Sequence, residues 1–122
     1  MAKVIVVLAD GFEEIEAVSV IDILRRAEVE VCVAGLSVNA VKGAQGILVN
    51  PDAAIGDVDS DKYDMIVLPG GTVGARNILN DEATDKILRK YAEEEKYIAA
   101  ICAAPHVLAD KGLLKGCMAT SY

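Results

Sequence analysis

Three runs of apolar residues, each next to turn signals and helical patterns, constrain the fold most strongly. Residues 3–9 (KVIVVLA) form the first run, which is rich in valine and isoleucine and has no polar residue after Lys3. A continuous run of this kind is typical of a strand buried on both faces of a parallel sheet. Residues 64–68 (DMIVL) and 97–101 (YIAAI) repeat the pattern. We therefore predict an α/β fold with a doubly wound parallel sheet, because strands that alternate with helices give right-handed crossovers.

The segments between these runs predict the remaining elements. Residues 39–46 indicate a loop or hairpin, and no linker or internal repeat divides the 122 residues, so a single domain over residues 1–122 is expected. We expect helices over residues 13–26, 73–79 and 82–95, and further strands over residues 29–36 and 47–49.

Charge and cysteine content narrow the range of partners. The formal net charge of −7 argues against a nucleic-acid backbone or an anionic membrane as the main partner, since both attract clusters of Lys and Arg. Cys32, Cys102 and Cys117 are widely spaced and the chain has a single histidine, so neither a disulfide framework nor a metal site is expected. Because the sequence has no secretory leader and no membrane-spanning run, we expect a cytoplasmic protein.

Cys102 follows the third apolar run and is surrounded by alanines. Small neighbours suit a sharp turn from strand to helix, where the backbone is crowded, and such a turn lifts its apex side chain out of the sheet. The positive end of the following helix favours thiolate over thiol. Cys102 is therefore a candidate nucleophile, and the alternative is a small buried cysteine at the end of a strand.

Two other turns, at residues 10–12 and 69–71, also follow predicted strands. In a doubly wound sheet the ligand site lies outside the carboxyl ends of the strands, so we expect both turns and Cys102 to meet at one crevice. Gly70 and Gly71 would let the backbone approach a ligand closely and turn amides towards it, although an ordinary turn is the alternative. No GxGxxG motif follows the first strand, so dinucleotide binding is not expected.

Glu16 is the second candidate catalytic residue. On a helix over residues 13–26 it shares a line with Phe12, Val20 and Ile23, so its carboxyl group would lie along an apolar flank. A carboxyl group removed from water holds its proton more readily, which suits it to hydrogen-bond a thiolate and to act as an acid or a base. The alternative is a partly exposed helix residue.

The other polar residues near these motifs are expected to have ordinary roles. Glu13 and Glu14 have the positions of first-turn helix acids. His106 lies one helical turn after Cys102 and should point away from the turn, so a surface or packed imidazole is favoured over a catalytic base.

Three motifs together resemble the ThiJ/PfpI superfamily. They are FEEIE at residues 12–16, LPGG at residues 68–71 and AAICAAP at residues 99–105, and they occur in the order and at the separations that the family shows. The similarity runs from Lys3 to the end of the chain and is greatest to the branch of the Parkinson-disease protein DJ-one and its bacterial relatives. The resemblance implies a flavodoxin-like α/β sandwich, a homodimer and a site that needs no cofactor.

The resemblance also implies roles for individual residues. Cys102 would be the nucleophile, hydrogen-bonded to a protonated Glu16. Gly70, Gly71 and Ala103 would supply backbone N–H groups around a reacting oxygen or an oxidised sulfur.

The chain departs from the family pattern at three points. Protease-like members have a histidine directly after the nucleophile, where this chain has Ala103, so a cysteine–histidine hydrolase is disfavoured. A histidine of the DJ-one branch corresponds here to Tyr122, which leaves Tyr122 and His106 as accessory candidates. Family chains also continue further, so we expect a fold incomplete at its C-terminus and a companion C-terminal segment, because an unpaired last strand would expose a sheet edge.

Three functions of different classes fit these residues to different degrees. The first is a cysteine-dependent glyoxalase or deglycase in which Cys102 attacks methylglyoxal, glyoxal or their early adducts. The second is a redox-sensing stress protein or chaperone in which Cys102 is oxidised to a sulfinate. The third, a protease or amidase or a thiamine-thiazole biosynthesis protein, has no support from individual residues.

Overall fold

A five-stranded parallel sheet forms the centre of the computed structural model, which describes residues 2–114. A separate antiparallel hairpin lies beside the sheet, and its strands are β3 (Val41–Lys42) and β4 (Leu48–Val49). The strands of the main sheet are β1 (Lys3–Leu8), β2 (Glu30–Gly35), β5 (Ala53–Ala54), β6 (Met65–Leu68) and β7 (Tyr97–Ala100). The helices are α1 (Glu14–Arg26), α2 (Thr72–Leu79), α3 (Glu82–Glu93) and α4 (Pro105–Asp110), with short 3₁₀ turns η1 (Ile55–Asp57) and η2 (Ser60–Lys62).

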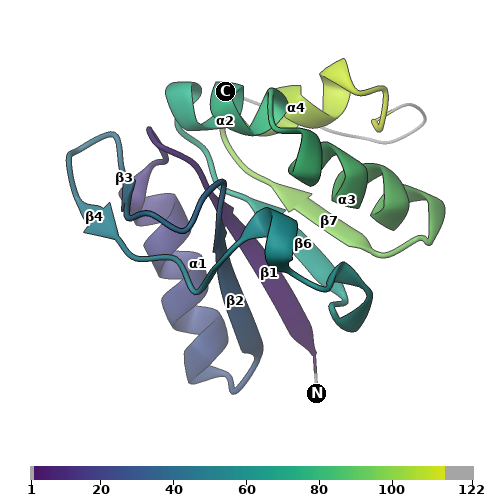
Figure 1. The fold of residues 1–122 in the computed structure, drawn as a ribbon, viewed down its shortest axis with the longest axis horizontal. Helices are drawn as coiled ribbons and strands as arrows, with labels where there is room; N and C mark the ends of the chain where they lie inside the picture. Colours follow the sequence, from purple (N-terminus) through teal and green to yellow (C-terminus); the bar gives the residue numbers. More distant parts are fainter. Residues whose placement is uncertain (1, 115–122) are drawn as a thin grey trace.

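The strand order β5-β2-β1-β6-β7 makes β1 the central strand. The chain leaves β1 towards β2 and β5 on one side and then returns to β6 and β7 on the other (Figure 1). β1 pairs with β2 along its whole length, from Lys3 opposite Glu30 to Leu8 opposite Gly35. This reversal of direction at β1 confirms the predicted doubly wound sheet and marks the position where ligands bind in such folds.

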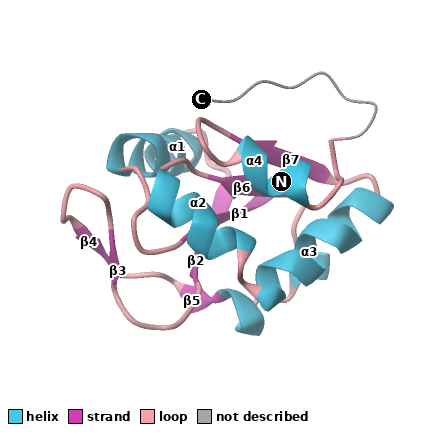
Figure 2. Cartoon of the chain, turned by 90° about the horizontal axis from the view of Figure 1, so that it is seen from above, coloured by secondary structure: helices cyan, strands magenta, loops and turns pink. Residues whose placement is uncertain are grey.

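Helices cover both faces of the sheet, as Figures 1 and 2 show. Val4, Val6 and Leu8 belong to one apolar cluster together with Ala17 and Ile21 of α1. Ile5 and Val7, which point to the opposite face, belong to a second cluster that includes residues of α2, α3 and α4. Each of these strand residues is at most 4% exposed, so the prediction of a strand buried on both faces is confirmed.

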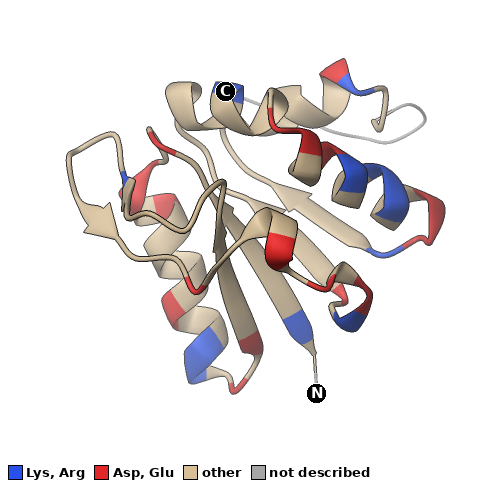
Figure 3. Ribbon diagram, viewed as in Figure 1, with Lys and Arg blue, Asp and Glu red and all other residues tan. Residues whose placement is uncertain are grey.

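In the main sheet, charged residues lie only at the first positions of strands (Figure 3). In the sheet, Lys3 and Glu30 begin neighbouring strands and form an exposed ion pair of 3.4 Å. An exposed pair of this kind contributes about 0–1 kcal/mol to stability. Most of the folding free energy must therefore come from the two apolar clusters, where each fully buried large side chain contributes about 1.5–3 kcal/mol.

Tyr91 fastens α3 to the turn η2. Its side chain is fully buried, and its hydroxyl group donates to the Ser60 carbonyl oxygen at 2.6 Å. Lys96 Nζ lies 4.9 Å from the centre of the Tyr91 ring and donates to the Tyr63 carbonyl oxygen at 2.8 Å. Burial is the main cause that raises the pKa of Tyr91 to about 12.

The structure differs from the sequence-based expectation mainly in the short elements. The predicted hairpin is present, with Val41 opposite Val49. β5 and the two 3₁₀ turns between it and β6 were not predicted, because two or three residues are too few to show a periodic pattern. The third predicted helix ends at Glu93 rather than at residue 95, where Glu95 has a φ of +58°.

Candidate active site

Cys102 lies in the sharp turn between β7 and α4. Its φ angle is +61°, in the left-handed region, which costs about 1–2 kcal/mol for a residue with a side chain. The Ala104 N–H group closes the turn by donating to the Ile101 carbonyl oxygen at 3.0 Å, and Pro105 begins the helix. Such strain persists only where the surrounding structure enforces it, and it is concentrated at functional sites. The strained turn predicted at Cys102 is therefore present.

Gly70 separates the Cys102 side chain from the Glu16 carboxyl group. A methyl group added to Gly70 would lie 2.7 Å from Cys102 Cβ and would also overlap Glu16 Oε1. The two side chains are therefore neighbours on the same face of this glycine. Glu16 Oε1 is buried and has no hydrogen-bond partner among residues 2–114. Because a buried polar atom without a partner is unfavourable, this oxygen is suited to share a proton with a thiol or a ligand.

Backbone atoms form the floor beside this pair. Gly71 has a φ of +101°, and a methyl group there would lie 2.8 Å from the Glu13 amide nitrogen. The Glu13 N–H group donates to the Gly70 carbonyl oxygen at 3.0 Å. A methyl group on Gly74 would lie 2.9 Å from Phe12 Cα. The loop after β1 and the turn after β6 are thus in direct backbone contact.

Cys102 and Glu16 open into one cavity of about 460 Å³ at the carboxyl edge of the sheet. The predicted meeting of the three turns is confirmed, because each contributes to the lining of this cavity. Its lining residues are Gly11, Glu13, Glu16, Ala44, Gly71, Thr72, Val73 and Cys102. Ala44, from the β3–β4 hairpin, was not predicted, since nothing in the local sequence connects the hairpin to the turns.

His106 lies away from this cavity. It is exposed on α4 and lines a groove between α2 and α4 together with Arg76 and Ala103. This position agrees with the expectation that its side chain points away from Cys102. His106 is not among the residues that line the Cys102 cavity, and its accessory role stays a prediction.

The backbone amides expected to surround a reacting oxygen are those of Gly70, Gly71 and Ala103. Within residues 2–114, none of these N–H groups donates to a backbone carbonyl. Their role as donors to a ligand stays a prediction. Tyr122, the other accessory candidate, lies outside the described residues.

The acidic residues at the start of α1 differ from the expectation. Glu13 is the N-cap, and its Oε1 accepts from the Ile15 N–H group at 3.3 Å. Glu14 lies in the first turn of α1, as predicted, but it is buried, with only 6% of its surface exposed. The buried face of α1 runs through Glu14, Ala17 and Ile21 rather than along the line of Glu16, so Glu16 lies at the edge of that face.

The exposure of Ile23 also argues against the apolar flank that was expected beside Glu16. Its side chain is 64% exposed, so the flank does not continue along α1. The burial of Glu16 Oε1 results instead from its position beside Gly70 and Cys102.

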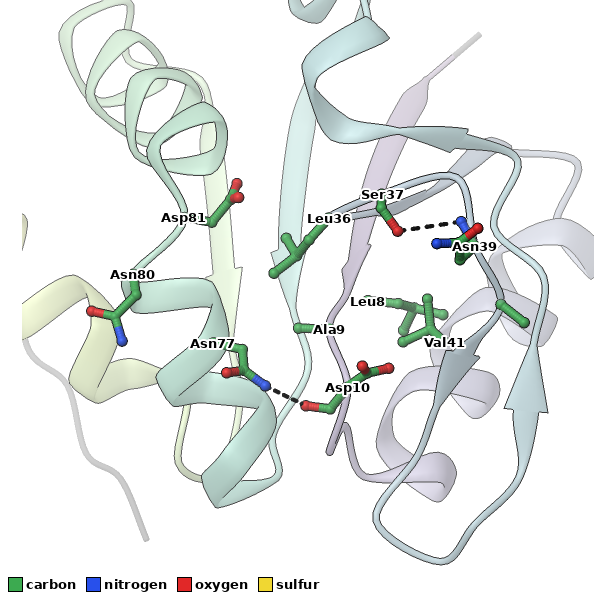
Figure 4. A pocket seen from close by; sticks show the side chains of 11 residues that line it. Leu8, Ala9, Asp10, Leu36, Ser37, Asn39, Val41, Asn77, Asn80 and Asp81 are labelled. Atoms are coloured by element: carbon green, nitrogen blue, oxygen red, sulfur yellow. Dashed lines mark hydrogen bonds between the residues drawn. The ribbon is translucent and has the colours of Figure 1, made fainter.

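A second hollow, of about 420 Å³, lies at the carboxyl ends of β1 and β2 (Figure 4). Asn77 of α2 donates from Nδ2 to the Asp10 carbonyl oxygen at 2.8 Å, and Ser37 Oγ accepts from the Asn39 N–H group at 3.3 Å. The hollow shares no lining residue with the Cys102 cavity and contains neither cysteine nor histidine. Its contribution to the site is the Asn77–Asp10 hydrogen bond, which holds α2 against the loop after β1.

Among residues 2–114, no three His, Cys, Asp or Glu side chains are grouped so that they could hold a metal ion. No helix in the same range is long and apolar enough to cross a bilayer.

Known proteins match the chain over nearly all of its length. Residues 2–122 match the DJ-1/PfpI family. The chain belongs to the DJ-1/PfpI family. Within this family it is 43% identical over 119 residues to the protein dj-1beta of Drosophila melanogaster. The aligned residues cover 97% of this chain and 64% of that relative. It is also 38% identical over 119 residues to a deglycase of Thermococcus kodakarensis, covering 98% of this chain and 71% of that relative.

Solved structures of the DJ-1/PfpI family agree with the fold. Oxidized DJ-1 of Toxoplasma gondii superposes with a TM-score of 0.96 at 43% identity, covering all of this chain and 67% of that one. DJ-1beta of Drosophila melanogaster superposes with a TM-score of 0.87 at 42% identity, covering 91% of this chain and 60% of that one. The chain therefore spans about two thirds of the length of these relatives. The α/β fold with its parallel sheet is that of the family.

Proposed function

We propose that the chain carries the active site of a cysteine-dependent glyoxalase or deglycase that needs no cofactor. Its substrates would be methylglyoxal or glyoxal and the early adducts that these dicarbonyls form on amines and thiols. The observation that carries the proposal is the position of Cys102, in a strained turn and across Gly70 from the buried Glu16 Oε1. The similarity to a relative named deglycase supports the same activity.

The proposed first step is attack of the Cys102 thiolate on the aldehyde carbon of methylglyoxal. A carbon–sulfur bond forms, the carbonyl π electrons move to oxygen, and a proton completes the hemithioacetal. The backbone N–H group of Gly71 would stabilise the oxygen while it carries negative charge.

Glu16 would then carry a proton between the two carbons of the dicarbonyl. Removal of the hydrogen from the former aldehyde carbon and its return to the neighbouring carbon converts the hemithioacetal into a lactoyl thioester. Water hydrolyses the thioester and releases lactate and the Cys102 thiol. The sum is methylglyoxal plus one water giving lactate, with no external oxidant or reductant.

The proposal is tested by measuring lactate formed from methylglyoxal by the purified protein. We expect Cys102→Ser to abolish lactate formation and Cys32→Ser to leave it intact, because Cys32 lies on β2 away from the cavity. Equal lactate formation by the wild type and Cys102→Ser would exclude this mechanism.

A redox-sensing role in the stress response is the second candidate. The same buried Glu16 Oε1 could hydrogen-bond a Cys102 sulfinate, and a structural relative is described as oxidized. In two steps, hydrogen peroxide would transfer one oxygen to the sulfur each time and leave as water. Under limiting peroxide, peptide mass spectrometry should find two added oxygens on Cys102 before Cys32 is modified. A protein that is oxidised in this way but forms no lactate would favour the sensor over the enzyme.

The homodimer and the cytoplasmic location also stay predictions. Ile15 and Val18 lie one turn apart on α1 and are 75% and 44% exposed, and Ile47 and Leu48 of the hairpin are 54% and 65% exposed. A second copy of the chain would remove these side chains from water, which favours association. Sedimentation velocity of the wild type and of Ile15→Asp measures whether this surface forms the dimer.

A further inference from the structure

The segment between β3 and β4, residues 43–47, forms a strap over one side of the Cys102 cavity. Ala44 is the strap residue that lines the cavity, and its side chain is exposed. The Ala44 N–H group donates to the Phe12 carbonyl oxygen at 2.8 Å, and Gly43 N–H donates to the Ile47 carbonyl oxygen at 2.9 Å. The strap is therefore a closed turn that rests on the loop after β1.

Glu14 anchors this strap from below. Its Oε2 accepts from the Gln45 N–H group at 2.8 Å and from the Ile47 N–H group at 3.2 Å. A methyl group on Gly43 would overlap the Glu14 carboxyl group, so the strap lies directly against the side chain. Burial would raise the pKa of Glu14, but its backbone hydrogen bonds outweigh this effect and hold the pKa below its usual value. Glu14 is thus a charged anchor at neutral pH.

We propose that Ala44 is a specificity-determining residue and that Glu14 is the positioning residue that holds it in the cavity wall. The strap then sets the largest group that a substrate can carry to Cys102. This inference rests on the proposed function for its substrates, because it distinguishes free dicarbonyls from the bulkier adducts on amines and thiols.

The walls formed by Gly11, Gly71 and the start of α2 have backbones that packing holds in place. Gly11 and Gly71 contribute backbone, and both are packed against neighbouring residues. Thr72 and Val73 belong to the first turn of α2, whose backbone is fixed by the sheet and by the Asn77–Asp10 hydrogen bond. Within residues 2–114, the strap is held through its ends, through the Ala44–Phe12 hydrogen bond and through Glu14. Among these attachments, Glu14 is the one that a side chain supplies.

The first experiment measures access to Cys102 without requiring any enzymatic activity. Alkylation rates are determined with iodoacetamide, which is small, and with N-phenylmaleimide, which is bulky, and the site is identified by peptide mass spectrometry. Glu14→Ala should raise the rate with N-phenylmaleimide by at least about fivefold, while the rate with iodoacetamide stays within about twofold of the wild type. Ala44→Phe should do the reverse and lower the rate with N-phenylmaleimide by about tenfold.

Two controls separate positioning from general destabilisation. Glu14→Gln keeps an oxygen that can accept from Gln45 and Ile47, so it should retain the size preference of the wild type. Glu82→Ala removes an exposed first-turn acid from α3 and should also behave as the wild type. If Glu14→Ala does not fold, Ala44→Phe decides the question. An unchanged ratio of the two alkylation rates in Ala44→Phe, or in folded Glu14→Ala, would overturn the inference.

The second experiment applies the same variants to turnover. The ratio of kcat/KM for methylglyoxal to that for its adduct with N-acetylarginine should rise about tenfold in Ala44→Phe. If the wild type turned over neither substrate, the proposed function would be refuted. The role of the strap would still be tested by the alkylation ratios. Turnover with an unchanged ratio would refute the role of Ala44 and leave the proposed function standing.

Discussion

Replacement of Gly70 by Ala tests whether Glu16 and Cys102 act as a pair. Gly70 is buried and its φ is not positive, so the substitution adds a methyl group without straining the backbone. That methyl group would lie 2.7 Å from Cys102 Cβ and would overlap Glu16 Oε1. Both side chains must therefore move away from each other.

The size of the effect follows from this geometry. Carbon atoms in contact are normally about 3.5–4.0 Å apart, so the Cys102 side chain must move by roughly 1 Å. Overpacking of this kind costs about 1–3 kcal/mol of folding stability. A misplacement of about 1 Å at a reacting group lowers its rate by about 100-fold. We therefore expect a folded but less stable protein that has lost nearly all of its turnover of methylglyoxal.

Urea unfolding measures the stability change, and lactate formation and Cys102 alkylation measure the effect on the site. Gly56→Ala is the matched control, because a methyl group at Gly56 would meet no atom within 4 Å. It should leave stability, turnover and alkylation unchanged. If Gly70→Ala matched Gly56→Ala in all three measurements, Glu16 and Cys102 would not share the face of Gly70 as described.

Cys102 should be the one cysteine that reacts rapidly with iodoacetamide at about pH 6. Cys32 should react slowly, because it is half-buried and burial raises the pKa of its thiol. Equal labelling of all cysteines in a peptide map would remove the case for an activated nucleophile. Glu16→Gln should preserve the urea midpoint and slow the alkylation of Cys102 by about tenfold, whereas Glu14→Gln should leave the alkylation rate unchanged. Similar rates for the two variants would place Glu16 outside the site. Tyr91 ionises near pH 10 in the unfolded chain and near pH 12 in the folded one, so stability should fall by roughly 2–3 kcal/mol as the pH rises from 10 through 12. Tyr91→Phe should not show this loss of stability at alkaline pH. At neutral pH it should be less stable than the wild type by about 1 kcal/mol, because it lacks the hydrogen bond to Ser60. If stability fell equally with alkaline pH in both proteins, the burial of the phenol would be contradicted.

The long strands and the Cys102 turn could be predicted because their signals are local. A run such as residues 3–9 is apolar throughout, and few structures other than a doubly covered strand can bury it. The turn at Cys102 has small neighbours and a proline at the start of the following helix, and both features act within a few residues. The two-residue strand β5 has no such signal, since it exists only through its pairing with β2.

The different environments of the neighbouring acids could not be predicted. Glu13 and Glu14 are adjacent and look alike in a local reading, whereas Glu16 was expected to differ from both. Glu14 becomes an anchor only because Gln45, 31 positions along the chain, folds onto it. Ala44 reaches the cavity for the same reason. Long-range contacts of this kind follow from the packing of the hairpin against α1, and no periodicity in the sequence encodes them.

The backbone contacts beneath the cavity have a consequence for how this site can change over time. Where Gly71 and Gly74 press against the main chain of residues 11–13, the neighbouring atoms are backbone and cannot rearrange as a side chain would, so a larger residue at either position would overlap them. New substrate ranges in proteins built this way must therefore arise from the rim, at positions such as Ala44, Thr72 and Val73, while the floor stays the same. If the proposed function and the role of Ala44 hold, separate sets of residues encode the chemistry at Cys102 and the choice of its substrate, and mutation can alter them independently.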